Sequence, residues 1–308
     1  MSRPASAWIA LAIVMVIAPA VLGVASRTRA LLTRRRGAPV LQLYYDLAKL
    51  LRRGSVFSDT TTRVFRIAPA GLLAATCMAA TIVPLDGRGA LIRFPGDVVA
   101  LAYALALGRF FLVLAALDTG SSFEGMGASR EVTVASVVEL GLFLSFGTLA
   151  ALTQSTSLSG MLGAPLAAAW PGGSPAIVMT AVGLFALMLA ECARVPVDDP
   201  ATHLELTMIH EVMILDHSGP DLALILYAAA LELSIIAAIV VTLLVPRGNM
   251  PVIVSLAALG AGLIVIGVAI GVIEAALARL RLPKIPLYLA SASSLALFGL
   301  VLVLWSGA

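Results

Sequence analysis

Eight long apolar stretches divide this chain and restrict what it can fold into. Most come close to the roughly 20 residues that a helix needs to cross the hydrocarbon core of a bilayer, and polar segments separate them. Composition agrees, since 60% of the 308 residues are hydrophobic. We therefore expect an all-α integral membrane protein that forms a single membrane domain over residues 1–308. The predicted spans are Ala7–Val24, Ile67–Val83, Val98–Leu117, Val132–Leu152, Pro175–Cys192, Leu222–Val245, Pro251–Ile273 and Pro286–Trp305.

The basic residues are distributed unevenly between the two sides of this bundle. If the N-terminus lies outside, the cytoplasmic loops hold fifteen of the twenty Lys and Arg residues. Because positive charge accumulates on the cytoplasmic side, this predicts a multi-pass protein of the cell inner membrane with its N-terminus outside. The strongest positive charge follows the first apolar stretch, which favours a retained helix over a signal peptide.

Several classes of protein are excluded by charge and cysteine content. The net charge of +3 follows membrane topology and gives no indication of nucleic-acid binding. Cys77 and Cys192 stand alone, so the chain has neither a disulfide framework nor a Cys-rich zinc or iron–sulfur site. We expect no cofactor, metal or catalytic residue in this chain.

The segment between the fifth and sixth spans carries much of the acidic charge. Pro196 and Pro200 disfavour a helix over Val195–Asp199, whereas the pattern from Pro200 to Leu215 predicts a helix capped by Asp199. Three histidines recur every seven residues here, too far apart to share one metal without another ligand. The acidic residues are Asp198, Asp199, Glu205, Glu211, Asp216 and Asp221, and the histidines are His203, His210 and His217.

Five ionisable residues fall inside or at the ends of the apolar stretches. A charge at membrane depth costs at least about 2.5 kcal/mol on insertion scales and marks a functional path by default. Arg109 lies in mid-span and could be the counter-charge to one of the acids. Taken singly, each acid could be structural; together they predict a proton route. The five are Arg109, Glu139, Glu191, Glu232 and Glu274.

Two polar loops have readable patterns. After Pro39, leucines line one helical face and Gln42, Asp46 and Lys49 line the opposite one. This predicts an amphipathic helix, which either lies on anionic lipid or supports a docking surface. The loop LDTGSSFEGMGASRE predicts a tight turn with Arg130 and Glu131 as an interfacial ion pair.

These motifs together resemble the membrane subunit shared by respiratory complex I, where it is called subunit 1, and the group 4 NiFe hydrogenases. The sequence is most similar to the formate hydrogenlyase and hydrogenase-4 component C branch. The loop after Glu205 is longer than in the quinone-reducing branch, which favours the hydrogenase type. The motifs are Arg36-Gly37 with Gln42, Asp46 and Lys49; LDTGSSFEGMGASRE with Glu139; Ala190-Glu191, Arg194, Pro196, Asp198, Pro200 and Glu205-Leu206; and Glu274 with Arg279 and Arg281.

The resemblance implies an eight-helix protein that links an electron-transfer arm to ion-pumping membrane subunits. Its expected partners are the lipid bilayer, NiFe-hydrogenase-like large and small subunits, an Fe–S protein and antiporter-like membrane subunits, with the NiFe and Fe–S clusters held by those partners. The candidate proton route is Glu139, Glu191, Glu205, Asp198, Asp199, Glu232 and Glu274. The supporting charges are Arg109, Arg130 and Arg194, and the candidate docking residues are Arg36, Gln42, Asp46, Lys49, Arg279 and Arg281.

Three alternatives remain at this point. The chain could be the quinone-binding membrane component of an NADH:quinone oxidoreductase, which a different set of neighbouring subunits would reveal. It could be a stand-alone ion transporter, although it shows no internal repeat. It could also be a passive anchor whose intramembrane acids are paired and silent.

Overall fold

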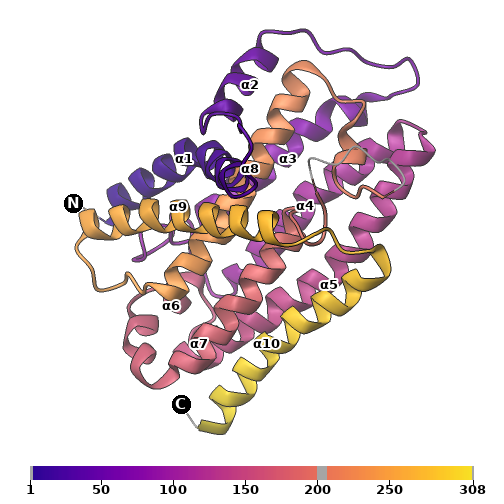
Figure 1. The fold of residues 1–308 in the computed structure, drawn as a ribbon. Helices are drawn as coiled ribbons and strands as arrows, with labels where there is room; N and C mark the ends of the chain where they lie inside the picture. Colours follow the sequence, from indigo (N-terminus) through magenta and orange to yellow (C-terminus); the bar gives the residue numbers. More distant parts are fainter. Residues whose placement is uncertain (1–2, 200–206, 307–308) are drawn as a thin grey trace.

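The computed structural model describes residues 3–199 and 207–306, and over these residues it contains helices and no strand (Figure 1). Eight of the described helices are long and apolar enough to cross a membrane. This confirms the prediction of an all-α membrane protein with eight spans. They are α1 (Arg3–Leu32), α3 (Arg63–Ile82), α4 (Asp97–Asp118), α5 (Ser122–Thr153), α7 (Ala164–Glu191), α8 (Gly219–Leu244), α9 (Val252–Ala276) and α10 (Ile285–Ser306).

Four shorter elements lie in the connections between the spans. The predicted amphipathic helix is α2, and none of its residues is fully buried. The others are a short helix between α5 and α7 and two 3₁₀ helices on the side opposite to it. Their bounds are α2 (Gln42–Leu51), α6 (Leu158–Met161), η1 (Glu211–Ile214) and η2 (Leu282–Lys284).

The spans form three groups around α8, and the pair α3 and α4 is one of them. Helices α1 and α9 lie side by side, and α5, α7 and α10 pack together on another side of the bundle (Figure 1). Helix α8 contacts α1, α3, α7 and α9 and is the most buried span. The α1–α9 contact is close because α9 has a glycine there: a Cβ at Gly267 would lie 2.9 Å from the carbonyl oxygen of Val21.

Three spans extend eight or more residues past their predicted limits. Helix α1 continues beyond Val24 to Leu32, α5 begins at Ser122 and not at Val132, and α7 begins at Ala164 with two prolines inside it. Hydropathy detects only the apolar part of a helix, so charged or proline-containing turns were assigned to loops. As a consequence, the prediction of a tight turn over LDTGSSFEGMGASRE is wrong from Ser122 onward, where the chain is helical.

The predicted helix from Pro200 to Leu215 is also wrong where it can be checked. Residues 200–206 lie outside the described residues, and from Thr207 the chain forms turns and then the 3₁₀ helix η1. The backbone N–H groups of Ile209 and His210 donate to Asp198 Oδ2 at 3.0 and 3.1 Å. A side chain thereby takes the donors that a continuous helix would pair with carbonyl groups.

A buried polar cluster fastens the loops at the end of the bundle opposite to α2. The Arg247 side chain is fully buried and donates to the carbonyl oxygens of Leu85 and Ser255 and to Thr242 Oγ1. Nearby, Asp86 accepts from Ser6 Oγ at 2.6 Å and from two backbone N–H groups. Burial lowers the pKa of Arg247 to about 10, with Asp86 opposing that shift.

Candidate functional site

One guanidinium at membrane depth faces three carboxylates. Arg109 lies in the middle of α4, and its Nε atom is 3.4 Å from Glu131 Oε1, while Nη1 is 3.7 Å from Glu139 Oε1. Its Nη2 atom donates to Glu191 Oε1 at the end of α7. The structure thus confirms Arg109 as an internal counter-charge and shows that it serves acids from both α5 and α7.

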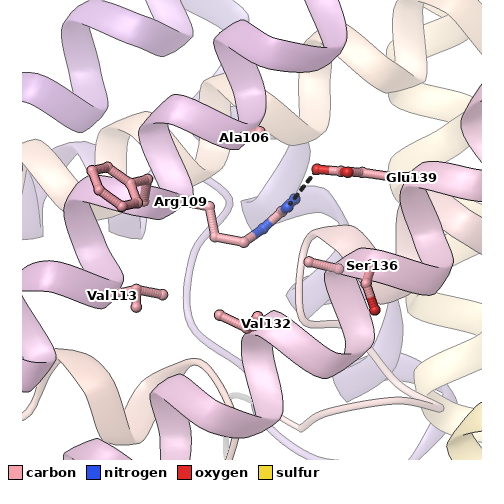
Figure 2. Close-up of a pocket in the computed structure, with 8 residues that line it drawn as sticks. Ala106, Arg109, Val113, Val132, Ser136 and Glu139 are labelled. Carbon is pink, nitrogen blue, oxygen red and sulfur yellow. Dashed lines mark ion pairs between the residues drawn. The ribbon is translucent and has the colours of Figure 1, made fainter.

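The arrangement follows from helix packing. Glu131 and Glu139 are two turns apart on α5, which packs against both α4 and α7. Figure 2 shows the Arg109 side chain reaching from α4 across a cleft toward Glu139 on α5. The cleft has a volume of about 220 Å³, and the Glu139 side chain is 37% exposed while that of Glu191 is 2% exposed. The cluster therefore runs from a lateral opening to the interior of the bundle.

The charges in this cluster do not balance. If all three carboxylates were ionised, Arg109 would leave two negative charges uncompensated. Uncompensated charge in a low-dielectric region is costly. The cluster is accordingly suited to taking up and releasing a proton or another small cation.

A second ionic cluster lies where the chain leaves α7. Arg194 pairs with Glu274 of α9 at 3.5 Å, and Arg29 of α1 pairs with Asp199 at 3.2 Å and with Glu274 at 4.0 Å. Asp198 pairs with Arg279 at 3.1 Å. These pairs join the ends of α1, α7 and α9 to the loop that follows α7, so the structure brings Asp198, Asp199 and Glu274 into one region.

The glycine-rich start of α5 packs against η1, in the part of the loop that precedes α8. A Cβ at Gly127 would lie 3.0 Å from the Ile209 carbonyl oxygen and 3.1 Å from Met213 Cγ, so only glycine allows η1 to approach α5 so closely. Arg130 Nη1 donates to the carbonyl oxygen of Met208 at 2.9 Å. The loop is thereby fixed to the same helix that carries Glu139.

A second cavity connects the two clusters. It has a volume of about 80 Å³ and is lined by Glu191 of the first cluster, by Arg194 of the second and by Glu232 of α8. Glu232 therefore reaches the Arg109 cluster through this cavity, whereas Glu139 and Glu191 contact Arg109 directly. Because Glu191 belongs to both the Arg109 cluster and the cavity, the described residues form a continuous polar path.

Other predicted positions have simpler surroundings. Arg36, Lys49 and Arg281 lie on the surface, and Gln42 donates to Asp46 at 2.9 Å on α2. Arg279 is engaged inside the chain with Asp198 and Thr207. Glu205, like Pro200 and His203, lies outside the described residues. The docking role of this set stays a prediction.

Glu131 is the member of the Arg109 cluster that the sequence analysis missed. The prediction that it pairs with Arg130 is wrong, because Arg130 bonds the Met208 carbonyl and Glu131 pairs with Arg109. The spacing between Glu131 and Glu139 could have indicated that both acids lie on the same helical face. Once α5 is extended back to Ser122, both acids lie in one helix, two turns apart.

The two described histidines of the loop have different environments. The ring of His217 is stacked on Phe65, with centroids 3.9 Å apart, and burial lowers its pKa to about 4, against the opposing effect of Asp221 and Asp216. Burial also lowers the pKa of His210, with Glu211 and Asp198 opposing it. No three His, Cys, Asp or Glu side chains among residues 3–199 and 207–306 are grouped to hold a metal.

The chain matches the protein-family model described as NADH dehydrogenase over residues 5–304. It is 33% identical to hydrogenase-4 component C of Escherichia coli (strain K12) over 237 residues, which span 77% of this chain and 74% of that protein. It is 31% identical to formate hydrogenlyase subunit 4 of the same organism over 282 residues, or 89% and 90% of the two chains.

More distant similarity extends to quinone-linked and respiratory complexes. A subunit of the NADH-quinone oxidoreductase of Bacteroides thetaiotaomicron is 26% identical over 208 residues, which span 66% of this chain and 56% of that protein. A solved chain of the membrane-bound sulfane sulfur reductase, an archaeal respiratory membrane complex, superposes with a TM-score of 0.83 at 17% identity. That match covers 98% of this chain and 100% of the other, and it establishes a shared fold.

Proposed function

The chain belongs to the NADH dehydrogenase family that includes complex I subunit 1, and we propose that it is the coupling subunit of a hydrogenase-4 or formate hydrogenlyase-like complex. It is a multi-pass membrane protein whose relatives are subunits of larger complexes. In the proposal it resides in the inner membrane with its N-terminus outside. The partners are NiFe-hydrogenase-like large and small subunits, an Fe–S protein and antiporter-like membrane subunits, and those partners carry the redox centres.

The observation that carries this proposal is the excess of acids around Arg109. Passive ion pairs in a membrane protein balance one another, whereas here Glu131, Glu139 and Glu191 share one guanidinium. The polar path continues through the cavity beside Glu191 to Arg194, at the loop where a soluble arm would dock. Such a path is what charge transfer from the loop to the membrane interior requires.

The physical coupling in the proposal is electrostatic. Electron arrival in a docked arm adds negative charge near the loop that contains Asp198 and Asp199. In a low-dielectric environment that charge acts over a longer distance than in water, so it alters proton occupancy at Glu191 and then at Glu139. Arg109 contacts both acids and would transmit the change between them.

The experiment has two parts. The first is purification of the complex through a tag on this chain, with identification of the copurifying subunits by mass spectrometry. The second is ion uptake by inverted membrane vesicles that contain Glu139→Gln, Glu191→Gln or Glu205→Gln. Loss of a positioned proton-transfer group should lower translocation per electron about ten-fold or more. If all three variants assemble and translocate ions normally, the proposal fails.

A quinone-binding role is the second candidate, because the chain also aligns with a subunit of an NADH-quinone oxidoreductase. The copurified subunits distinguish the two. A large subunit with paired Cys-x-x-Cys motifs for nickel supports the hydrogenase type, and an NADH-oxidising arm without such motifs supports the quinone type. Recovery of this chain alone with ion transport in liposomes would contradict both.

A further inference from the structure

The cavity beside Glu191 has a composition suited to ordered water. Its volume of about 80 Å³ exceeds the roughly 10–15 Å³ that one water needs. Helices α1 and α2 contribute the apolar side chains of Leu22 and Leu43 to its wall. The charged groups that face the cavity are Glu191, Arg194, Glu211 and Glu232.

One histidine also lines this cavity. The loop holds His210 in place, because its backbone N–H donates to Asp198 Oδ2 at 3.1 Å and the next residues form η1. The Nδ1 atom of its ring is buried and has no hydrogen-bond partner in the described part of the chain. A buried polar atom without a partner is costly unless water or another group bonds to it, and the adjoining cavity can supply that water.

We propose that water fills this cavity and that the imidazole of His210 relays protons between the loop and the acids Glu191 and Glu232. The His210 relay rests on the proposed function, and it adds one residue, His210, to the proposed proton path. Sequence reasoning assigned His210 no role, because its spacing to the other histidines suggested only an incomplete metal site.

The relay step conserves protons. One ring nitrogen of His210 accepts a proton that a cavity water passes on, while the other nitrogen releases its proton to the next acceptor. The ring then rotates about its Cβ–Cγ bond, so that the two nitrogens exchange places before the next proton arrives. Burial keeps the ring neutral at physiological pH because it lowers the pKa of His210, and a neutral imidazole both donates and accepts. Glu211 and Asp198, on the loop itself, oppose the burial effect.

The test is His210→Asn in the intact complex, compared with His217→Asn as a matched control on the same loop. Inverted vesicles receive electrons from reduced methyl viologen, hydrogen formation measures electron flow, and ACMA quenching measures proton uptake. For His210→Asn we expect proton uptake per electron to fall several-fold with hydrogen formation intact. For His217→Asn we expect uptake per electron to match that of the unsubstituted complex.

A second pair of variants separates a relay from a packing role. His210→Glu restores a titratable group and should recover part of the uptake with a shifted pH profile. Ala229→Leu should displace water from the cavity without altering a polar group, and should lower uptake as His210→Asn does. If His210→Asn fails to assemble, the Ala229→Leu result decides.

The outcomes distinguish this inference from the proposed function. Normal uptake in His210→Asn or in Ala229→Leu, together with loss of uptake in Glu191→Gln, overturns the His210 relay alone. Absence of both proton and ²²Na⁺ uptake in the unsubstituted complex overturns the proposed function. Uptake of ²²Na⁺ with no proton movement also overturns the relay, because imidazole does not carry sodium.

Discussion

Arg247 is fully buried and the Arg109 side chain is only 11% exposed, yet the partners of these two guanidinium groups differ. Arg109 faces three carboxylates from α5 and α7, next to a cleft and a cavity. Arg247 is fully buried and gives its hydrogen bonds to two backbone carbonyl groups and a threonine hydroxyl. The first cluster has more acids than its single base can neutralise, whereas the second uses fixed, neutral acceptors.

This difference separates a site that can change its charge from one that only holds the fold. Backbone carbonyl groups do not titrate, so the direct hydrogen bonds of Arg247 keep one state and join the loops at its end of the bundle, where one carboxylate, that of Asp86, lies near this one base. Carboxylates that share one guanidinium have several states of similar free energy. Burial of charge alone is therefore a poor indicator of function, and the balance of charges is a better one.

The largest effect is expected from Arg247→Met. It leaves the carbonyl groups of Leu85 and Ser255 without this donor in a buried site, and at about 1–3 kcal/mol for each unsatisfied group the loss of stability should be about 2–6 kcal/mol. Thermal unfolding of the purified complex measures this. Exposed Arg93→Met on the same side is the control and should change stability little. Normal unfolding of Arg247→Met would show that this cluster is dispensable for the fold.

Lowering the pH should produce the next largest effect, through His217. Because burial lowers its folded pKa from 6.5 to about 4, the unfolded chain binds the proton more readily. Stability should be highest above about pH 6.5 and fall by roughly 3 kcal/mol as the pH drops to about 4. His217→Phe keeps the stack on Phe65 and removes the titratable group.

His217→Phe is the control for the expected loss of stability between about pH 6.5 and pH 4. Thermal unfolding of His217→Phe should lose the part of the pH dependence that lies between about 6.5 and 4. Ion translocation at neutral pH should be the same in both proteins. An unchanged pH dependence would show that other groups cause the effect. A loss of translocation would show that His217 takes part in ion translocation and does not only stabilise the fold.

The comparison between the clusters is tested most directly by two acid-to-amide substitutions. Glu131→Gln relieves the charge excess around Arg109, so it should lower ion translocation and leave thermal stability unchanged or higher. Asp97→Asn is the matched variant at the other end, where Asp97 accepts from the Leu158 N–H at 2.6 Å and from Ser157 Oγ. It should cost about 1–3 kcal/mol of stability without altering translocation. The reverse pattern would refute the distinction.

The smallest effect is expected from Arg29→Gln. Its guanidinium is partly solvated and pairs with Asp199 at 3.2 Å, so the loss should be about 0.2–1 kcal/mol. A double-mutant cycle with Asp199→Asn, followed by thermal unfolding in low and high salt, measures the coupling. A coupling above about 2 kcal/mol would show that the second cluster is structural in the same sense as the Arg247 cluster.

Much of the architecture could be predicted because it depends on local sequence. Apolar stretches identified all eight spans, and amphipathic periodicity identified α2. The association of Arg109 with an intramembrane acid followed from the cost of burying charge. Charged residues lower the hydropathy of the first turns of α5, so the predicted span began at Val132 and left Glu131 outside it.

The structure of the loop after α7 depends on contacts that are distant in sequence. Asp198 takes the N–H groups of Ile209 and His210, and Arg279 approaches from beyond α9. Helical periodicity carries no information about such contacts, so it predicted a helix where a side chain captures the backbone donors. The cavity beside Glu191 likewise exists only after five elements have packed.

The continuity of α5 has a mechanical consequence. Gly127, where η1 rests, and Glu139, which meets Arg109, lie twelve residues apart on one unbroken helix, or about 18 Å along its axis. Because α5 is one continuous helix, a force applied near Gly127 also moves the turn that carries Glu139. A soluble protein that binds η1 could therefore tilt α5 as a rigid body. A displacement of less than about 1 Å at Glu139 would lengthen or shorten its contact with Arg109 without any local rearrangement at either residue.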